Sequence, residues 1–193
     1  MLLSIIKADK LQVILRIIMR LRGFTWSWFA FLVMKDAKIG KALNAIGWPS
    51  LTHRNGQINI GDNCFIGKGT LKVTEGAELE IGDRVLINNG FVISSNEKVC
   101  IGNDSLIGEY VSIRDADHAF DSLELTISKQ GMKTAPIVIG DNVWIGRGTV
   151  ILKGVVIGEG VIIGANSVVT KDIEAHSIVV GNPARLIKSR VGV

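Results

Sequence analysis

The chain contains few residues of the types that mark secreted, disordered or redox-active proteins. Its 193 residues include two cysteines, three prolines and three histidines. Two cysteines do not make the disulfide framework of a secreted domain, so we expect a reducing, cytoplasmic compartment. With 47% hydrophobic residues and little proline, a solvated, disordered chain is excluded. A chain of this length can bury a sizeable core, which favours one domain with a terminal appendage.

Long uncharged hydrophobic runs are also missing. No uncharged run is longer than the 12 residues of 23–34, which is shorter than the ~20 residues that a membrane-spanning helix needs. Arginines at positions 16, 20 and 22 interrupt the apolar segment before it, and no small-residue cleavage site follows, so a signal peptide fits poorly. Neither a Gly-x-Gly-x-x-Gly fingerprint nor a Walker loop occurs, so nothing indicates a bound mononucleotide or nicotinamide cofactor.

Basic charge is concentrated at the N-terminus. Residues 1–41 hold eight Lys or Arg against two Asp or Glu, whereas residues 42–193 hold fourteen against sixteen. This distribution argues against a nucleic-acid surface on the main body of the protein. Residues 1–22 have apolar positions at helical spacing with basic residues between them, and an aromatic-rich run follows. Two interpretations stay open: a helix that lies on a membrane surface through residues 1–35, or a helix that packs on the protein or on a neighbouring subunit.

Glycine and aliphatic residues are abundant, and they recur with a period of six. Between residues 139 and 180 an aliphatic residue occupies almost every sixth position, and glycine follows directly at positions 140, 146, 158 and 164. This period fits neither an amphipathic helix nor an alternating strand. It predicts a parallel β-helix in which each hexapeptide makes one short strand and one bend. Glycine suits the bend because it tolerates positive φ and a close backbone approach. The aliphatic positions expected to stack inward are Ile139, Ile145, Ile151, Ile157, Ile163 and Val169.

The fifth residue of each hexapeptide is small or β-branched and is also expected to face inward. Cys64 occupies this position, so we interpret it as a buried apolar side chain rather than a redox or metal-binding group. The same period extends back to residue 58, and faintly to residue 39. The predicted core therefore runs through most of the chain.

The period is lost between residues 113 and 139, where the sequence is polar and has few periodic aliphatic residues. A regular solenoid must extrude such an interruption as a loop. We therefore predict a basic, apolar-aromatic helical segment over residues 1–41 and a β-helix domain over residues 42–193, with an extruded loop at 114–138. Loops on a rigid scaffold are where chemistry is expected.

The repeat and the closing segment Gly181-Asn182-Pro183-Ala184-Arg185 resemble the hexapeptide-repeat acyltransferase family over roughly residues 55–190. The resemblance implies an all-β fold, a left-handed parallel β-helix with a short N-terminal helical segment and one extruded loop. The left hand comes from the resemblance alone, since crossovers between parallel strands are otherwise right-handed. It further implies a homotrimer with acetyl-CoA, the acyl donor, in a groove between β-helices. Bacterial sugar and exopolysaccharide O-acetyltransferases are the branch that the chain resembles most.

His118 lies inside the predicted loop, flanked by Asp115, Asp117 and Asp121. A neutral imidazole can accept a proton from a hydroxyl at neutral pH, and a nearby carboxylate can fix its tautomer. The resemblance implies that His118 is the general base that activates an acceptor hydroxyl for attack on the thioester of acetyl-CoA. It also implies that Asp117 binds a substrate hydroxyl, while Asp115 and Asp121 are candidates for orienting the imidazole. Which carboxylate supports His118 stays open, and a backbone carbonyl is an alternative partner.

The resemblance implies roles for five further residues. Asn88 matches an asparagine that binds the acceptor sugar or assists at the tetrahedral intermediate, although the Asn-Gly pair that follows is also a turn signal. Lys171 and Arg185 match positions that contact the nucleotide end of CoA, where phosphate groups favour cations. Trp144 and Gly146 are expected along the pantetheine groove, with core or intersubunit packing as the alternative for Trp144.

Two other functions are compatible with a β-helix. A zinc enzyme of the carbonic anhydrase type needs histidines that converge on one ion, and His53, His118 and His176 follow no such spacing, so no metal site is predicted. A non-catalytic scaffold or membrane-surface binding protein has no need of His118 together with the two cations. We therefore predict an acetyl-CoA-dependent O-acetyltransferase that acts on a sugar hydroxyl of a cell-surface polysaccharide or its lipid-linked precursor. Its expected place is the cytoplasm, with peripheral contact to the inner face of the membrane, and no nucleic-acid partner is expected.

Overall fold

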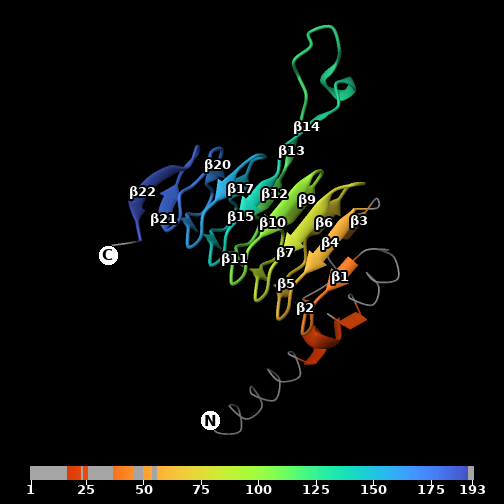
Figure 1. Cartoon of the computed structure of the whole chain (residues 1–193), viewed down its shortest axis with the longest axis vertical. Coiled ribbons are helices and arrows are strands. Elements are labelled where there is room, and N and C mark those ends of the chain that lie inside the picture. The colour runs from red at the N-terminus through yellow and green to blue at the C-terminus, as the bar shows by residue number, and fades with distance from the viewer. Residues whose placement is uncertain (1–16, 23, 26–36, 46–49, 54–55, 191–193) are drawn as a thin grey trace, which may run out of the picture.

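A computed structural model describes residues 17–22, 24–25, 37–45, 50–53 and 56–190. Nearly all of them lie in short strands and turns (Figure 1). Three sheets, A, B and C, surround a single core, and their strands are parallel except for the last, which pairs antiparallel in sheet B. The chain passes through the three sheets in turn, so each circuit adds one strand to each sheet. The predicted all-β, left-handed parallel β-helix with one extruded loop is confirmed.

The three sheets are the sides of a prism, and their strands follow its axis in chain order. Sheet A contains β1 (Ala37–Ile39), β4 (Gln57–Ile60), β7 (Glu78–Ile81), β10 (Lys98–Ile101), β15 (Ile137–Ile139) and β18 (Val156–Ile157). Sheet B contains β2 (Asn44–Ala45), β5 (Phe65–Ile66), β8 (Leu86–Ile87), β11 (Leu106–Ile107), β16 (Trp144–Ile145), β19 (Ile162–Ile163), β21 (Ser177–Val180) and β22 (Arg185–Ser189). Sheet C contains β3 (Ser50–His53), β6 (Thr70–Val73), β9 (Val92–Ser95), β12 (Ser112–Arg114), β17 (Val150–Ile151) and β20 (Val168–Val169).

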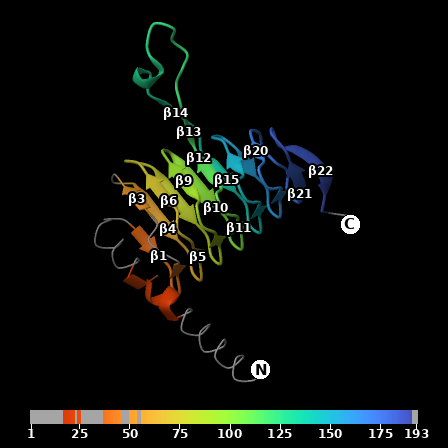
Figure 2. The same ribbon diagram turned by 180° about the vertical axis from the view of Figure 1, so that it is seen from behind.

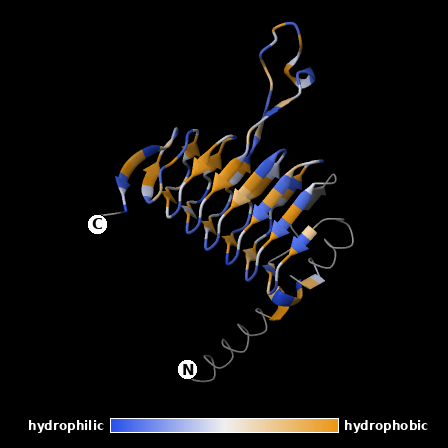
Figure 3. Cartoon of the chain, in the orientation of Figure 1, coloured by the Kyte–Doolittle hydropathy of each residue, from blue (hydrophilic) through white to orange (hydrophobic). Residues whose placement is uncertain are grey.

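The core is built from the residues that the period of six selects. The inward aliphatic residues from Ile139 to Val169 are no more than 2% exposed. The fifth-position residues, such as Val143 and Val161, are equally buried, and Cys64 is fully buried as predicted. Equivalent isoleucines pair from coil to coil, as Ile107 does with Ile145 and Ile145 with Ile163. Burial of each such side chain contributes about 1.5–3 kcal/mol. Figure 3 shows hydrophobic residues recurring in the strands along the prism, with hydrophilic residues between them.

The glycine that follows each inward isoleucine is required by close approach between coils. A Cβ atom on Gly102 would lie 2.5 Å from the carbonyl carbon of Gly140 in the next coil. Positive φ occurs two residues later instead, as at Asn63 (58°) and Asn142 (55°). Asparagine tolerates this left-handed conformation better than most residues. The predicted close backbone approach at these glycines is therefore confirmed. The positive φ occurs at another position of the hexapeptide.

A ladder of side-chain acceptors lines the corner between sheets A and B. The carboxylate of Asp62 accepts the amide N–H of Lys41 at 2.6 Å, and Asp83 accepts that of Asp62 at 2.7 Å. Asn103 and Asp141 continue the ladder at 2.8 and 2.7 Å. Each side chain reaches one coil back and satisfies an amide that the turn leaves unpaired. This ladder fixes the register between coils along the corner.

The predicted extruded loop leaves the prism at the corner between sheets C and A, after β12. Its base is a two-stranded antiparallel neck, formed by β13 (Ala116–His118) and β14 (Met132–Thr134), and its far part contains a short 3₁₀ helix, η1 (Ile127–Lys129). Figures 1 and 2 show from opposite sides that the loop stands clear of the prism. Although polar in overall sequence, the loop exposes apolar side chains toward its tip: Phe120, Leu123, Leu125 and Ile127.

The N-terminal segment is described only in part. Residues 17–22 and 24–25 are helical, and Ile17, Leu21 and Phe24 are more than half exposed. The remainder of the predicted helix and most of the aromatic run lie outside the described residues. No helix among the described residues is long and apolar enough to cross a bilayer. The domain division at residue 41 stays a prediction, and β1 lies on its N-terminal side.

The steric role of the corner glycines predicts a large difference between two alanine substitutions. We expect Gly102→Ala to destabilise the protein by about 2–3 kcal/mol, because its Cβ would overlap the backbone of the next coil. Gly131→Ala is the matched control, because Gly131 has φ 80° but open space around it, and only the conformational cost of about 1 kcal/mol applies. Thermal unfolding at one protomer concentration measures both. Equal melting temperatures for the two variants would contradict the packing explanation.

Candidate active site

His118 lies on the first strand of the neck, close to the prism rather than at the loop tip. Its register partner on β14 is Met132, and Asp117 faces Lys133. The amide of Ala119 donates to the carbonyl of Gly131 at 3.0 Å, which closes the neck just beyond the histidine. His118 and Asp117 are both exposed. The imidazole of His118 is therefore accessible to substrate, and the pairing of β13 with β14 fixes the direction of the strand that carries it.

The three aspartates around His118 have different partners. Asp117 pairs with Lys153 of the next coil, with 3.6 Å between its Oδ2 and the Lys153 Nζ. Asp121 forms an ion pair with Lys133 across the loop. Asp115 is fully buried, and its carboxylate accepts hydrogen bonds from the corner before the loop, the closest at 2.7 Å. Within the described residues no hydrogen bond or ion pair joins any of the three to the imidazole of His118.

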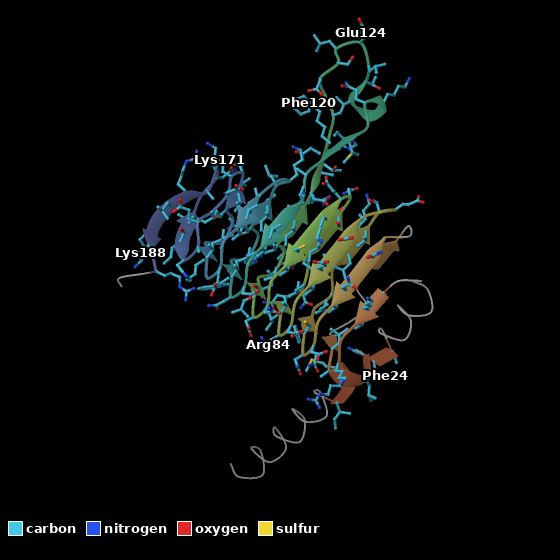
Figure 4. All side chains as sticks on the ribbon, in the orientation of Figure 1. Phe24, Arg84, Phe120, Glu124, Lys171 and Lys188 are labelled. Carbon is cyan, nitrogen blue, oxygen red and sulfur yellow. The ribbon has the colours of Figure 1, made fainter. Side chains whose placement is uncertain are left out.

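Lys171 lies at the same corner as His118. The corner between sheets C and A carries the loop after β12, Lys153 after β17, and Lys171 after β20. Adjacent strands of a sheet are about 4.8 Å apart, so the base of the loop and Lys171 are separated by roughly 10 Å along the axis. Figure 4 shows Lys171 on the side of the prism from which the loop rises. The structure therefore brings the predicted base and one predicted phosphate ligand to one edge.

Lys171 and Arg185 line one cavity of about 450 Å³ at the C-terminal end of the prism. The chain closes there with β22, which runs antiparallel to β21 and leaves a concave space against the turn after β20. The guanidinium of Arg185 donates to the carbonyl of Ala184 at 2.9 Å, and Asp172 accepts the amide of Val156 at 2.8 Å. The cavity is also lined by residues that the sequence did not single out: Thr170, Glu174, Ser177, Val179 and Leu186.

Asn88 and Gly146 lie at a different corner, between sheets B and C. Asn88 directly follows β8 and Gly146 directly follows β16. A Cβ atom on Gly146 would lie 2.5 Å from the amide nitrogen of Ala165, so this glycine serves the stacking of coils. Trp144 is 54% exposed on the outer face of sheet B. Within a single chain, sheet C separates these residues from His118.

Neither cysteine is suited to nucleophilic catalysis. Burial raises the pKa of the Cys64 thiol. Cys100 lies on the outer face of sheet A, 3.2 Å from an oxygen of Glu80, and burial followed by this hydrogen bond raises its pKa to about 11. Both thiols are protonated at neutral pH, and the thiolate is the reactive form. Among the described residues no group of three or more His, Cys, Asp or Glu is placed to hold a metal ion.

The hexapeptide repeats match two family descriptions. Residues 136–171 match "Bacterial transferase hexapeptide (six repeats)", and residues 57–95 match "Hexapeptide repeat of succinyl-transferase". WbbJ of Escherichia coli K12, which carries the name of a lipopolysaccharide biosynthesis O-acetyl transferase, is 34% identical over 151 residues. The match covers 74% of this chain and 77% of WbbJ. The chain belongs to the hexapeptide-repeat acyltransferase family.

Other proteins that are similar to the chain differ from it in length or were solved with coenzyme A. Rv3034c of Mycobacterium tuberculosis is 35% identical over 153 residues, and the chain spans 49% of its length. The N-acyltransferase AntD of Bacillus cereus, solved with dTDP-4-amino-4,6-dideoxyglucose and coenzyme A, has a TM-score of 0.66 and 25% identity, over 79% of this chain and 83% of AntD. Galactoside acetyltransferase in complex with coenzyme A has a TM-score of 0.55 and 28% identity, over 90% of this chain and 82% of that protein.

Proposed function

We propose that this chain is an acetyl-CoA-dependent O-acetyltransferase that acts on a sugar hydroxyl, with His118 as the general base. The observation that carries the proposal is the placement of an exposed His118 along the same edge as the cavity lined by Lys171 and Arg185. The binding of coenzyme A by AntD and galactoside acetyltransferase supports acetyl-CoA as the donor. The names of WbbJ and galactoside acetyltransferase support a saccharide acceptor.

In the proposed reaction His118 accepts the proton of the acceptor hydroxyl as its oxygen attacks the thioester carbonyl. The carbonyl carbon becomes tetrahedral, and its oxygen takes up negative charge that an amide N–H can stabilise. Collapse of this intermediate breaks the carbon–sulfur bond and releases CoA, whose sulfur is protonated by the imidazolium. Asp117 is placed one residue before the base, where it binds a hydroxyl of the acceptor while Lys153 holds its carboxylate.

The proposed site is completed by a second copy of the chain. Asn88, Trp144 and Gly146 lie across sheet C from His118, so a neighbouring prism must supply one of the two sets. The outer face of sheet B carries an apolar row, in which Leu106 and Trp144 are about half exposed. The tip of the loop is also apolar and free of its own prism, since Leu123 is fully exposed. A closed ring such as a homotrimer buries these surfaces and repeats the same contact three times.

The proposed acceptor is a cell-surface polysaccharide or its lipid-linked precursor. WbbJ supports this class by its name, and exposed Ile17, Leu21 and Phe24 beside Arg20 and Arg22 support contact with an anionic membrane surface. AntD favours a second candidate, transfer to an amino group of a nucleotide-linked sugar. Thiol release from acetyl-CoA, measured with a panel of oligosaccharides and nucleotide-linked amino sugars, separates the two. If acetyl-CoA does not bind at all, the non-catalytic scaffold replaces both.

The cavity at the C-terminal end predicts separate effects on donor binding and on chemistry. We expect Lys171→Ala and Arg185→Ala each to raise the KM for acetyl-CoA roughly tenfold with little change in kcat, because each removes a charge-assisted contact with phosphate. Lys188→Ala is the matched control, since Lys188 lies on β22 but does not line the cavity (Figure 4). An unchanged KM in both cavity variants would contradict this donor site.

The division of the site between two corners predicts complementation between inactive variants. His118→Ala and Asn88→Ala are each expected to lower kcat by about 100-fold or more. When the two are dissociated and reassembled in equal amounts, a cyclic ring should recover about a quarter of wild-type activity, because a quarter of the interfaces then combine an intact His118 with an intact Asn88. His118→Ala mixed with the double variant should recover none. Recovery of no activity in the first mixture would contradict a shared site.

The exposed apolar residues of the N-terminal helix predict membrane association. Replacement of both Leu21 and Phe24 by serine is expected to reduce co-sedimentation with vesicles containing phosphatidylglycerol by roughly tenfold. Activity on a soluble acceptor should not change. Ile187→Ser, on β22, serves as the control for general loss of apolar surface, since Ile187 is exposed and does not line the cavity. Equal binding by the wild-type and doubly substituted proteins would leave packing against protein as the role of this segment.

A further inference from the structure

Asp115 is a buried carboxylate whose oxygens are held by the turn of the preceding coil. Its Oδ1 accepts the amide N–H of Asn96 at 2.7 Å and the side-chain amide of Asn96 at 3.2 Å. Its Oδ2 accepts the amides of Asn96 at 3.0 Å and Glu97 at 2.8 Å, and the hydroxyl of Ser95 lies at 3.4 Å. The residue is 0% exposed, and no cation among the described residues pairs with it. A buried charge is tolerated only where hydrogen bonds replace its water.

This carboxylate lies at the point where both strands of the neck leave the prism. Asp115 directly precedes β13, and its carbonyl accepts the amide of Ala135, which directly follows β14, at 3.0 Å. The amide of Asp115 reaches the carbonyl of Ser94 at 3.4 Å. The carbonyl of Ala135 in turn accepts the amide of Gly154 in the next coil at 3.1 Å. The outgoing and returning strands are thus tied to one another and to the coils on either side.

The equivalent positions in earlier coils show that burial alone does not require an acid. Val73 on β6 pairs with Ser95 on β9. Arg114 on β12 pairs with Ser94, so the next residue, Asp115, is the equivalent of Ser95 in the following coil. Val73 and Ser95 are as buried as Asp115. The corner after Val73 closes through its own backbone, with the amide of Ala77 donating to Thr74 at 3.1 Å. The carboxylate therefore occurs only at the level where the chain leaves the prism.

We infer that Asp115 is a positioning residue for the general base, and this inference rests on the proposed function. By binding the amides of Asn96 and Glu97, it fixes the exit direction of β13, which carries His118 three residues later. Asp115 acts by holding the neck and not by contact with the imidazole, because the amides of Asn96 and Glu97 already bind its carboxylate oxygens. A small displacement of a catalytic group lowers the rate steeply.

The anchoring contact is tested without any measurement of activity. Hydrogen–deuterium exchange of segments 94–98 and 130–136 is compared between the full-length wild type and Asp115→Asn. The amide group of asparagine turns a donor toward backbone N–H groups, so exchange in both segments should accelerate at least tenfold. Glu124→Gln is the control, since Glu124 is an exposed carboxylate at the far end of the loop (Figure 4), away from both segments. Unchanged exchange in Asp115→Asn overturns the anchor.

The positioning role is tested by the dependence of the Asp115 effect on His118. Asp115→Asn is expected to lower kcat roughly 10- to 100-fold while the KM for acetyl-CoA stays within about twofold, since the donor cavity is on other elements. In a His118→Ala background the same substitution should change the residual rate by less than about twofold. An equal loss in both backgrounds overturns positioning and assigns Asp115 a general structural role.

Two controls keep this result separate from misfolding and from the proposed reaction. If Asp115→Asn does not fold, Asp115→Ser is measured instead, because serine already occupies the equivalent level in the preceding coil. If His118→Ala retains the wild-type rate, the proposed base is wrong and positioning falls with it. The exchange measurement then still decides whether Asp115 holds the neck.

Discussion

The fixed distance between successive coils is the constraint on which the rest of this structure depends. Adjacent parallel strands lie about 4.8 Å apart, so every side chain at a given level must fit directly against its equivalent above and below. Isoleucine fills the interior at one position of each hexapeptide, and glycine allows the corner to approach the next coil. The side-chain ladder from Asp62 to Asp141 satisfies the amides that the turn leaves open. These features repeat because the spacing repeats.

A scaffold so regular has room for chemistry only where the repeat is interrupted or ends. The interruption after β12 extrudes the loop with His118, and the end after β20 leaves the cavity with Lys171 and Arg185. Both departures occur along one edge of the prism, because the number of residues in each coil places them there. The edge therefore combines an exposed imidazole with a recess lined by Lys171 and Arg185, and the proposed transfer from a phosphate-bearing thioester depends on both.

The same regularity explains why one chain places the candidate site residues in two separate sets. Asn88, Trp144 and Gly146 belong to sheet B and its corner with sheet C, whereas His118 and Lys171 belong to the corner between sheets C and A. A prism cannot bend these corners together, since its packed core resists deformation. Exposed apolar side chains on sheet B and on the loop tip are consistent with contact between copies. Assembly is then part of the proposed site and not only a source of stability.

Much of this architecture could be predicted because its causes are local in sequence. The inward isoleucines, the burial of Cys64 and the place of the extruded loop all follow from a period of six and from its loss. His118 was a candidate because of its position in that loop, and its role as base stays a prediction. The stacking of coils also explains the glycine that directly follows an inward isoleucine, although positive φ falls two residues later, on Asn63 and its equivalents.

The remaining features depended on contacts between residues that are distant in sequence. The carboxylate of Asp115 binds amides 18 and 19 residues earlier, and nothing in its own hexapeptide indicates this. The exposed apolar tip of the loop was not expected from its polar sequence. The sequence by itself determined the coil, because an inward side chain every sixth residue has one efficient way to be buried. Only the tertiary structure decided which corner each candidate residue occupies, because that depends on the summed length of all preceding coils.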